Sequence, residues 1–311
     1  MNVLTLDNDK LARLALLVMY AWDMCDADIA SASTSVDPRI AAAGLTVLGF
    51  IAASDDIITS GPGGLRQNRV AASSHPDQKR YGYVAHDASG TQWYVVIRGT
   101  DGAEEWFDDF VFVAERRPGY PGRVETGFHD IYASMHLAMP NDPAGALPLA
   151  AGLAKLMPAG SSVLVLGHSL GAAIATYLAY DLAAPAPAGV GAQRAAALLF
   201  ASPKTGDHEF VDAFSNRFEN YLVLNYEHDL VPKVPPFDIT CFDLYRSLPQ
   251  CKIITDEVAR ARVRCLDKAC CHHLISYIAL LSPSTYQDAI KSAHCTNDNI
   301  ECAKCVESLV A

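Results

Sequence analysis

The stretch Val163-Leu164-Val165-Leu166-Gly167-His168-Ser169-Leu170-Gly171-Ala172-Ala173 decides how this chain folds. Its first four residues predict a short buried strand, and the alanine-rich run at its end predicts a helix. The pattern Gly-x-Ser-x-Gly between them is typical of a nucleophile elbow, a sharp strand-to-helix turn that exposes the serine hydroxyl. Gly167 and Gly171 lack a Cβ, so strand and helix can approach closely around Ser169. The alternative is an ordinary turn in which Ser169 only caps the helix.

Composition and charge narrow the class of protein. The chain has 311 residues, of which 50% are hydrophobic, and a net charge of −11. We therefore expect a large core, and neither nucleic acid nor an anionic membrane surface as a partner. The most apolar runs, Leu11–Trp22 and Ala41–Ala53, are shorter than the roughly 18–20 residues of a transmembrane helix. Asp7 and Asp9 stand where a secretory signal carries positive charge, so we expect a cytoplasmic protein or one exported without a cleaved signal.

Strand and helix patterns alternate after residue 80. The expected strands are 81–86, 91–97, 163–166, 195–201 and 221–226, and the expected helices are 9–23, 38 to about 53, 127–139, 147–157, 170–182, 209–218 and 273–281. This alternation predicts an α/β fold, α/β-hydrolase-like, with a mostly parallel sheet and helices on both faces. We expect one domain over 1–311, with a helical N-terminal part (1–75), a catalytic core (80–281) and a Cys-rich elaboration (about 241–311).

A serine nucleophile needs a histidine base and a carboxylate that orients this base. In chains with this elbow, the acid and then the histidine follow the serine. Asp229 comes just after the expected strand 221–226 and is the predicted acid, with Asp207 and Glu227 as rivals. Asp207 is better placed to cap the helix that begins near His208.

Three histidines follow the predicted acid: His272, His273 and His294. His272 and His273 open an apolar helix, which would anchor them, whereas His294 lies in a polar stretch flanked by cysteine. The base is therefore predicted to be His272 or His273.

Backbone N–H groups are predicted to stabilise the oxyanion that develops on an attacked carbonyl. The N–H of Leu170 lies at the helix start, where donors are unpaired and the helix dipole is positive. The second donor is predicted to be the N–H of Thr100, which follows the apolar strand 95–97 and Gly99. The Thr100 hydroxyl would be a third donor.

Eight of the nine cysteines lie between Cys241 and Cys305, and Cys25 is separate. We expect free thiols first, because a compartment reached without a signal peptide is reducing. Local disulfides come second, and a zinc site that uses Cys302 and Cys305 with Cys295 or His294 comes third.

Taken together, these motifs resemble the class 3 lipase family, the fungal-type triacylglycerol lipases, over about residues 80 to 281. The matching segments, in the order of the family, are Ile97–Thr100, Val124–Phe128, Gly167–Gly171, Ala201–Asp207 and His228–Pro232. The resemblance implies a lid tryptophan at Trp106, an aspartate at Asp109 that orients the oxyanion hydroxyl, and a supporting His168. The family's His-Ser-Leu-x-x-Tyr frame favours His272 as the base, whereas members with histidine directly before leucine would favour His273. Of the two, we predict His272.

The predicted function is hydrolysis of acylglycerols or related lipid esters by a serine, aspartate and histidine triad through an acyl-enzyme, without metal or cofactor. The partners expected are a lipid or small ester substrate and a transient lipid interface. The loop Asp101–Arg117 contains six acidic residues, which weakens a specificity for triacylglycerol. The alternatives are a phospholipase A or lysophospholipase effector, an inactive hydrolase-fold binding protein, and a metal-dependent activity in the Cys-rich part.

Overall fold

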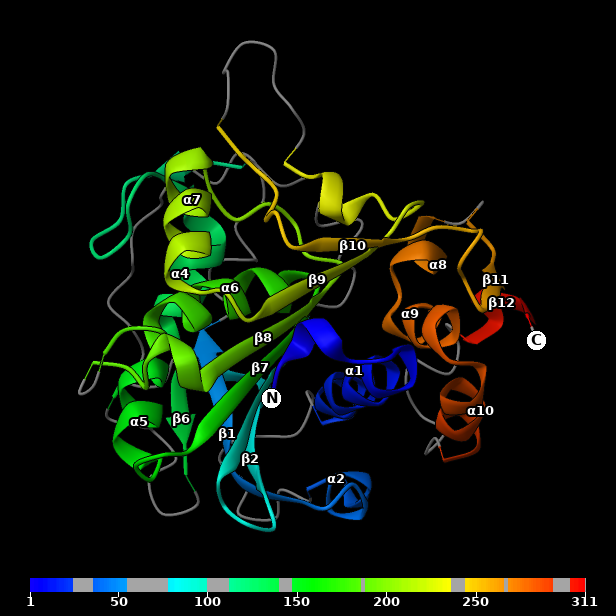
Figure 1. Cartoon of the computed structure of the whole chain (residues 1–311), viewed down its shortest axis with the longest axis horizontal. Helices are drawn as coiled ribbons and strands as arrows, with labels where there is room; N and C mark the ends of the chain where they lie inside the picture. Colours follow the sequence, from blue (N-terminus) through cyan, green and yellow to red (C-terminus); the bar gives the residue numbers. More distant parts are fainter. Residues whose placement is uncertain are drawn as a thin grey trace.

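The computed structural model describes residues 1–24, 36–54, 78–99, 112–139, 147–185, 188–235, 244–265, 268–292 and 303–310. Within these ranges, the centre is an eight-stranded sheet with the order β10-β9-β8-β7-β3-β2-β1-β6 (Figure 1). The strands are β1 (Leu45–Ser54), β2 (Gln78–Asp87), β3 (Gln92–Ile97), β6 (His136–Ala138), β7 (Ser162–His168), β8 (Ala195–Phe200), β9 (Tyr221–Tyr226) and β10 (Cys251–Ile254). From β3 to β10 all neighbours are parallel, and β2, β1 and β6 extend the sheet antiparallel.

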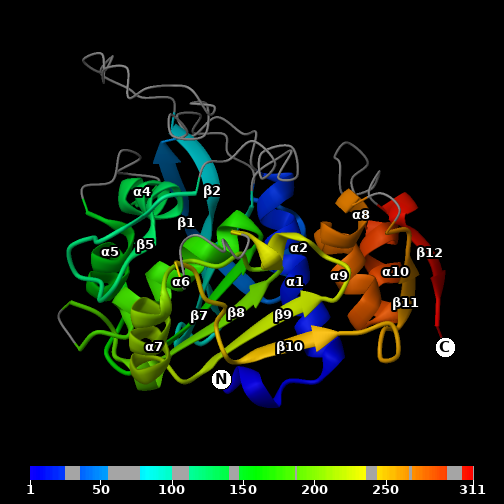
Figure 2. The same cartoon turned by 90° about the horizontal axis from the view of Figure 1, so that it is seen from above.

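Helices cover both faces of this sheet (Figure 2). One face carries α4 (Thr126–Ser134), α5 (Leu149–Leu156), α6 (Leu170–Leu182) and α7 (His208–Arg217). The other carries α1 (Asn8–Asp23), α2 (Pro38–Ala42), α8 (Lys268–His272), α9 (Leu274–Leu281) and α10 (Pro283–Ser292). None of the described helices combines the length and the apolar character needed to cross a bilayer.

Smaller elements complete the described chain. Two short antiparallel pairs are β4 (Ala114–Glu115) with β5 (Val124–Glu125), and β11 (Ala261–Val263) with β12 (Val306–Leu309). The 3-10 helices are η1 (Val3–Thr5), η2 (Ala192–Arg194), η3 (Val231–Lys233) and η4 (Ala303–Cys305).

The two cores explain why β7 is apolar at each position from Val163 to Leu166. Val163 and Val165 pack into the core beneath α4 to α7, whereas Leu164 and Leu166 pack into the core beneath α1 and α9. A strand covered on both faces loses the alternation of apolar and polar residues that marks an exposed sheet. The predicted mostly parallel sheet with helices on both faces is confirmed.

The predicted helix from 38 to about 53 was wrong. Helix α2 stops after one turn, because Gly44 adopts the left-handed conformation (φ +78°) that ends helices. The next residues form β1, which pairs antiparallel with β2 on one side and β6 on the other. A Cβ at Gly49 would lie 2.7 Å from the carbonyl oxygen of Ala138 in β6, so glycine permits this close approach. The N-terminal part therefore contributes a strand as well as helices.

The predicted helix 127–139 was too long. Helix α4 ends at Ser134, and His136–Ala138 forms the edge strand β6 against β1. The pairing with β1 is a contact between distant parts of the sequence, so it outweighs the local helical pattern. The remaining predicted strands and helices agree with the structure to within three residues, the largest difference being at the start of β2.

The expectation of free thiols was wrong for four cysteines. Disulfides join Cys265 to Cys271 and Cys270 to Cys305, with Cα–Cα distances of 5.3 and 5.1 Å. Cys251 is free. The expectation rested on a reducing compartment, and no pattern in the sequence shows which distant cysteines the fold brings together.

The predicted zinc site lacks one of its ligands, because Cys305 forms a disulfide with Cys270. The other predicted ligands lie outside the described residues: Cys295, Cys302 and His294. The same holds for two further cysteines, Cys25 and Cys241.

A buried carboxyl, Glu125, holds the start of α4. Its side chain caps the helix by accepting from the N–H of Phe128 at 2.7 Å, and it also accepts from the N–H of Val113 at 3.3 Å. Glu125 is 0% exposed, and burial raises its pKa to about 7 despite these hydrogen bonds. The folded protein therefore binds the proton of this carboxyl more tightly than the unfolded chain does. Because of this difference, the contribution of Glu125 to the free energy of unfolding decreases as pH rises from about 4.5 to about 7.

We expect Glu125→Gln to gain stability relative to the wild type as pH rises, because glutamine does not ionise. The difference in unfolding free energy between the two proteins should shift by about 3 kcal/mol in favour of the variant between pH 4 and pH 8. Urea denaturation at several pH values measures this shift. A difference that does not change with pH would contradict the assignment of a raised pKa to Glu125.

Candidate active site

Ser169 lies on the turn between β7 and α6, in a backbone conformation that side chains rarely adopt. Its φ and ψ are +58° and −129°, and its side chain is 0% exposed. Two glycines permit this turn. A Cβ at Gly167 would lie 2.4 Å from the Gly171 carbonyl oxygen, and a Cβ at Gly171 would lie 2.4 Å from that of Arg98. The strain at the serine is therefore maintained by close packing of backbone against backbone.

The structure brings Ser169, His272 and Asp229 together from three distant parts of the chain. The Ser169 hydroxyl lies 2.8 Å from Nε2 of His272. Nδ1 of His272 lies 3.0 Å from Oδ2 and 3.2 Å from Oδ1 of Asp229. Because a carboxylate only accepts, Nδ1 carries the proton, and Nε2 is left to accept the proton of the serine hydroxyl. His272 and Asp229 are 4% and 1% exposed, so these charge interactions are little weakened by water.

Asp229 is held by two donors besides His272. The Tyr277 hydroxyl donates to Oδ2 at 2.7 Å, and the Val231 N–H donates to Oδ1 at 2.9 Å. Tyr277 in turn accepts from the Tyr226 N–H at 2.9 Å, so its own position is fixed by the end of β9. Sequence reasoning gave Tyr277 no role, although it lies five residues after His272 in the frame that identified the base.

His168 supports the base through the main chain. Its Nε2 lies 2.8 Å from the carbonyl oxygen of His272, and the two imidazole rings are 4.8 Å apart. Since a carbonyl only accepts, His168 donates from Nε2. Burial and the neighbouring His272 hold the pKa of His168 well below its usual range, so it is a neutral donor.

The rival candidates have other partners. Asp207 caps α7, where it accepts from the N–H of Phe210, and it also binds the N–H of Arg123. Glu227 accepts from the N–H of Asp256. His273 occupies the N-cap position of α9 without a side-chain capping hydrogen bond, and the imidazole bonded to Ser169 is that of His272. The geometry therefore favours Asp229 and His272 over their neighbours.

The structure describes one of the two residues whose N–H groups are predicted to bind the oxyanion. Leu170 is the first residue of α6, where an N–H has no carbonyl one turn earlier to bind. Gly99 follows β3 and packs against Ser169, since a Cβ there would lie 3.0 Å from the serine Cβ. Buried Arg98 donates to the Gly99 carbonyl at 2.6 Å and so fixes the strand end. The predicted residues Thr100, Trp106 and Asp109 lie outside the described residues.

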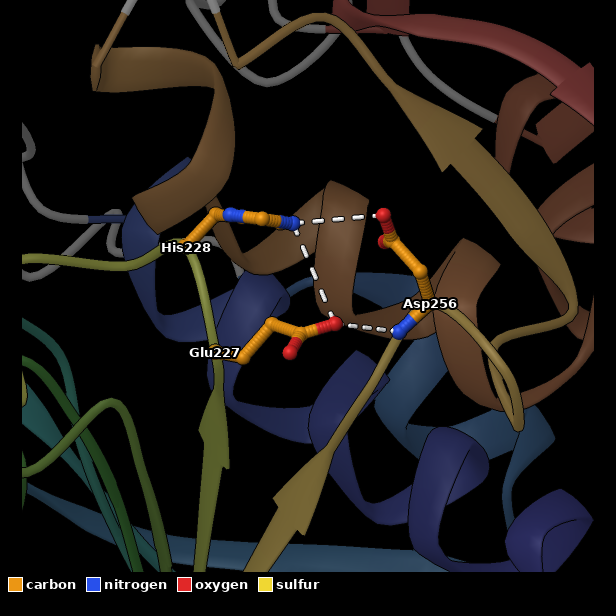
Figure 3. A group of neighbouring side chains, drawn as sticks. All are labelled: Glu227, His228 and Asp256. Carbon is orange, nitrogen blue, oxygen red and sulfur yellow. Dashed lines mark hydrogen bonds and ion pairs between the residues drawn. The ribbon is translucent and has the colours of Figure 1, made fainter.

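Glu227, His228 and Asp256 gather beside the loop that carries Asp229 (Figure 3). Their ligand-type atoms lie within 4.8 Å of one another, as a metal site would require. The Asp256 carboxylate, however, already accepts from the Tyr226 hydroxyl at 2.8 Å, and its Oδ2 lies 3.8 Å from the Arg262 guanidinium. That guanidinium would repel a cation. We interpret the cluster as a brace between the Asp229 loop and the turn after β10.

The chain resembles known proteins in family, sequence and fold. Residues 94–239 match the family described as lipase (class 3). Phospholipase A1-II 5 of rice (Oryza sativa subsp. indica) is 32% identical over an alignment of 221 residues that covers 63% of this chain and 47% of the rice protein. The chain spans less than half the length of this relative and of a second rice protein, phospholipase A1-II 2.

Two fungal structures share the fold. A mutant of MDLA from Penicillium cyclopium aligns with a TM-score of 0.54 and 24% identity over 81% of this chain and 82% of that chain. A deletion mutant of the Rhizomucor miehei lipase propeptide complex aligns with a TM-score of 0.53 and 23% identity over 80% of this chain and 68% of that chain. At these identities the likeness concerns the fold alone. Residues 94–239 of this chain, which carry both Ser169 and Asp229, match the class 3 lipase family, and the chain has the α/β-hydrolase fold.

Proposed function

We propose that this protein is a serine hydrolase that cleaves carboxylic esters of lipids through an acyl-enzyme. The observation that carries the proposal is the continuous chain of hydrogen bonds from Ser169 through His272 to Asp229. A buried serine with an oriented base, next to a helix start with an unpaired donor, has the parts that acyl transfer requires. The match to the lipase family supports the same reaction.

In the first half of the reaction, Nε2 of His272 takes the proton of Ser169 as Oγ attacks the ester carbonyl. Asp229 stabilises the imidazolium that forms, and the Leu170 N–H, together with the predicted Thr100 N–H, holds the oxyanion. His272 then protonates the leaving alcohol, which leaves an acyl group on Ser169. In the second half, His272 activates water in the same way, and the carboxylic acid is released.

The substrate we propose first is a phospholipid, cleaved at the ester of its first acyl chain. The support is the name of the curated rice relatives, phospholipase A1, because they match up to 63% of this chain. Leu230, directly after Asp229, is an apolar side chain that is 45% exposed. Because single exposed apolar side chains are common on protein surfaces, the transient contact with a lipid surface stays a proposal that the vesicle assay below tests. The location of the protein, in the cytoplasm or exported without a cleaved signal, stays a prediction.

Replacing Ser169 by alanine should lower ester hydrolysis by roughly 10⁴- to 10⁶-fold, because the nucleophile is lost. His272→Ala should cause a loss of similar size, and His273→Ala, the matched control, should retain most activity. Hydrolysis of a p-nitrophenyl ester measures all three variants, and thermal unfolding checks that each is folded. Full activity in Ser169→Ala would exclude Ser169 as the nucleophile.

Tyr277→Phe removes the hydroxyl that binds the Asp229 carboxylate. We expect kcat to fall about tenfold with little change in KM, because a hydrogen bond to a charged group is lost away from the substrate. Tyr83→Phe is the control, since it removes a buried hydroxyl that donates to the Leu17 carbonyl in another part of the fold. Steady-state kinetics of both variants test whether Tyr277 positions Asp229. If Tyr277→Phe and Tyr83→Phe have equal kcat values, Tyr277 contributes to stability alone.

A substrate comparison tests the proposed lipid class. Phosphatidylcholine vesicles labelled in the first acyl chain should release free fatty acid faster than a triacylglycerol emulsion of equal surface area. The Ser169→Ala variant gives the background for both. Faster release from the emulsion would replace the phospholipid proposal by a triacylglycerol lipase, and release from soluble esters alone would indicate an esterase.

A further inference from the structure

The residue we propose as the base, His272, directly follows two cysteines that form disulfides with different partners. Cys271 is bonded to Cys265, two residues after β11. Cys270 is bonded to Cys305, the last residue of η4 and the neighbour of β12. The short helix α8, which contains both cysteines and His272, is therefore tied covalently at two consecutive positions (Figure 2 shows α8 beside β11 and β12).

The two anchor points belong to one rigid unit. Strands β11 and β12 pair antiparallel, and the Arg264 N–H donates to the Cys305 carbonyl at 2.8 Å. The unit packs on α9, where Ala261 and Cys305 are buried in the same core as that helix. Since α9 follows His272 after one residue, the proposed base lies between α9 and a disulfide-linked unit that packs on this helix.

Helix α8 needs such support. It has five residues, and a helix of this length is not stable by its own hydrogen bonds. His272 must nevertheless reach Ser169 and Asp229 at once, over 2.8 and 3.0 Å. A displacement of about 1 Å at a catalytic group can cost on the order of 100-fold in rate. The hydrogen bond from His168 holds the His272 carbonyl, but it does not restrain the residues before the base.

We propose that the disulfides Cys265–Cys271 and Cys270–Cys305 position His272 for the reaction, and that this is a role of the Cys-rich part of the chain. The proposal rests on the function proposed above. The four cysteines are positioning residues, because they act through the main chain of α8 and contact neither Ser169 nor Asp229 in the hydrogen bonds described.

The two disulfides are expected to contribute differently to the stability of the fold, and this difference helps to separate that contribution from the positioning of His272. Cys270–Cys305 joins residues 35 apart in sequence, whereas Cys265–Cys271 joins residues only 6 apart. A disulfide restricts the unfolded chain less when its loop is short, so the loss of Cys265–Cys271 should disturb the fold less. Cys265 is also partly exposed, whereas Cys270, Cys271 and Cys305 are buried. The shorter disulfide therefore gives the cleaner test.

The double variant Cys265→Ser/Cys271→Ser should lose about 10- to 100-fold in kcat, while KM stays within about twofold. The downfield proton resonance of the His272 Nδ1–H in the wild type should broaden or disappear in the variant, because the bond to Asp229 is no longer fixed. Cys251→Ser, which removes a free cysteine, is the control and should match the wild type in both measurements.

A double variant with the kcat and the Nδ1–H resonance of the wild type would overturn the proposal. If the variant does not fold, the folded wild type is reduced with dithiothreitol, which is oxidised to its cyclic disulfide as two protein thiols form for each bond. Loss of kcat with unchanged far-UV circular dichroism supports positioning, and full kcat after complete reduction overturns it. A wild type without Ser169-dependent hydrolysis would instead refute the proposed function, and the resonance would still test the position of His272.

Discussion

The site depends on a contact between backbones in which no side chain takes part. At the elbow, α6 begins so close to the end of β3 that a methyl group at Gly171 would overlap the Arg98 carbonyl. The parallel pairing of β3 with β7, in which Ile97 lies opposite Gly167, sets this distance. The same pairing places Gly99 against Ser169 and the first N–H groups of α6 beside the strand end. The proposed nucleophile and the proposed oxyanion donor of α6 are therefore positioned by the same strand pairing.

Of the other two members of the proposed triad, only Asp229 follows a strand at the carboxyl edge of the sheet. Asp229 follows β9, and its carboxylate is satisfied by His272, Tyr277 and the Val231 N–H. Because this carboxylate is buried, each missing donor would leave part of its charge uncompensated in a medium of low dielectric. His272 comes from outside the sheet altogether. Its position depends on α9, on His168 and on the disulfide-linked segment before it, so the base is the member with the least support from the central fold.

Local sequence patterns predicted the central strands and the acid, because these depend on short-range features. The elbow glycines, the apolar runs of β7 to β9 and the position of Asp229 can each be recognised within a few residues. The errors arose where distant contacts decide. Strand β1 was taken for helix because its partners β2 and β6 are far away in sequence, and Gly44 was overlooked as a stop signal. The pairing of Cys270 with Cys305, and the bond from Tyr277 to Asp229, likewise require the folded chain.

The conformation of Ser169 has a consequence for how such a protein changes over evolutionary time. Its left-handed φ is imposed by Gly167, Gly171 and the strand ends, and the serine hydroxyl contributes nothing to it. The shape of the turn and the chemistry performed on it are thus encoded by different residues. A substitution of Ser169 that tolerates this backbone conformation would therefore remove the proposed nucleophile and leave the turn in place, so the activity could be lost in one mutation without loss of the fold.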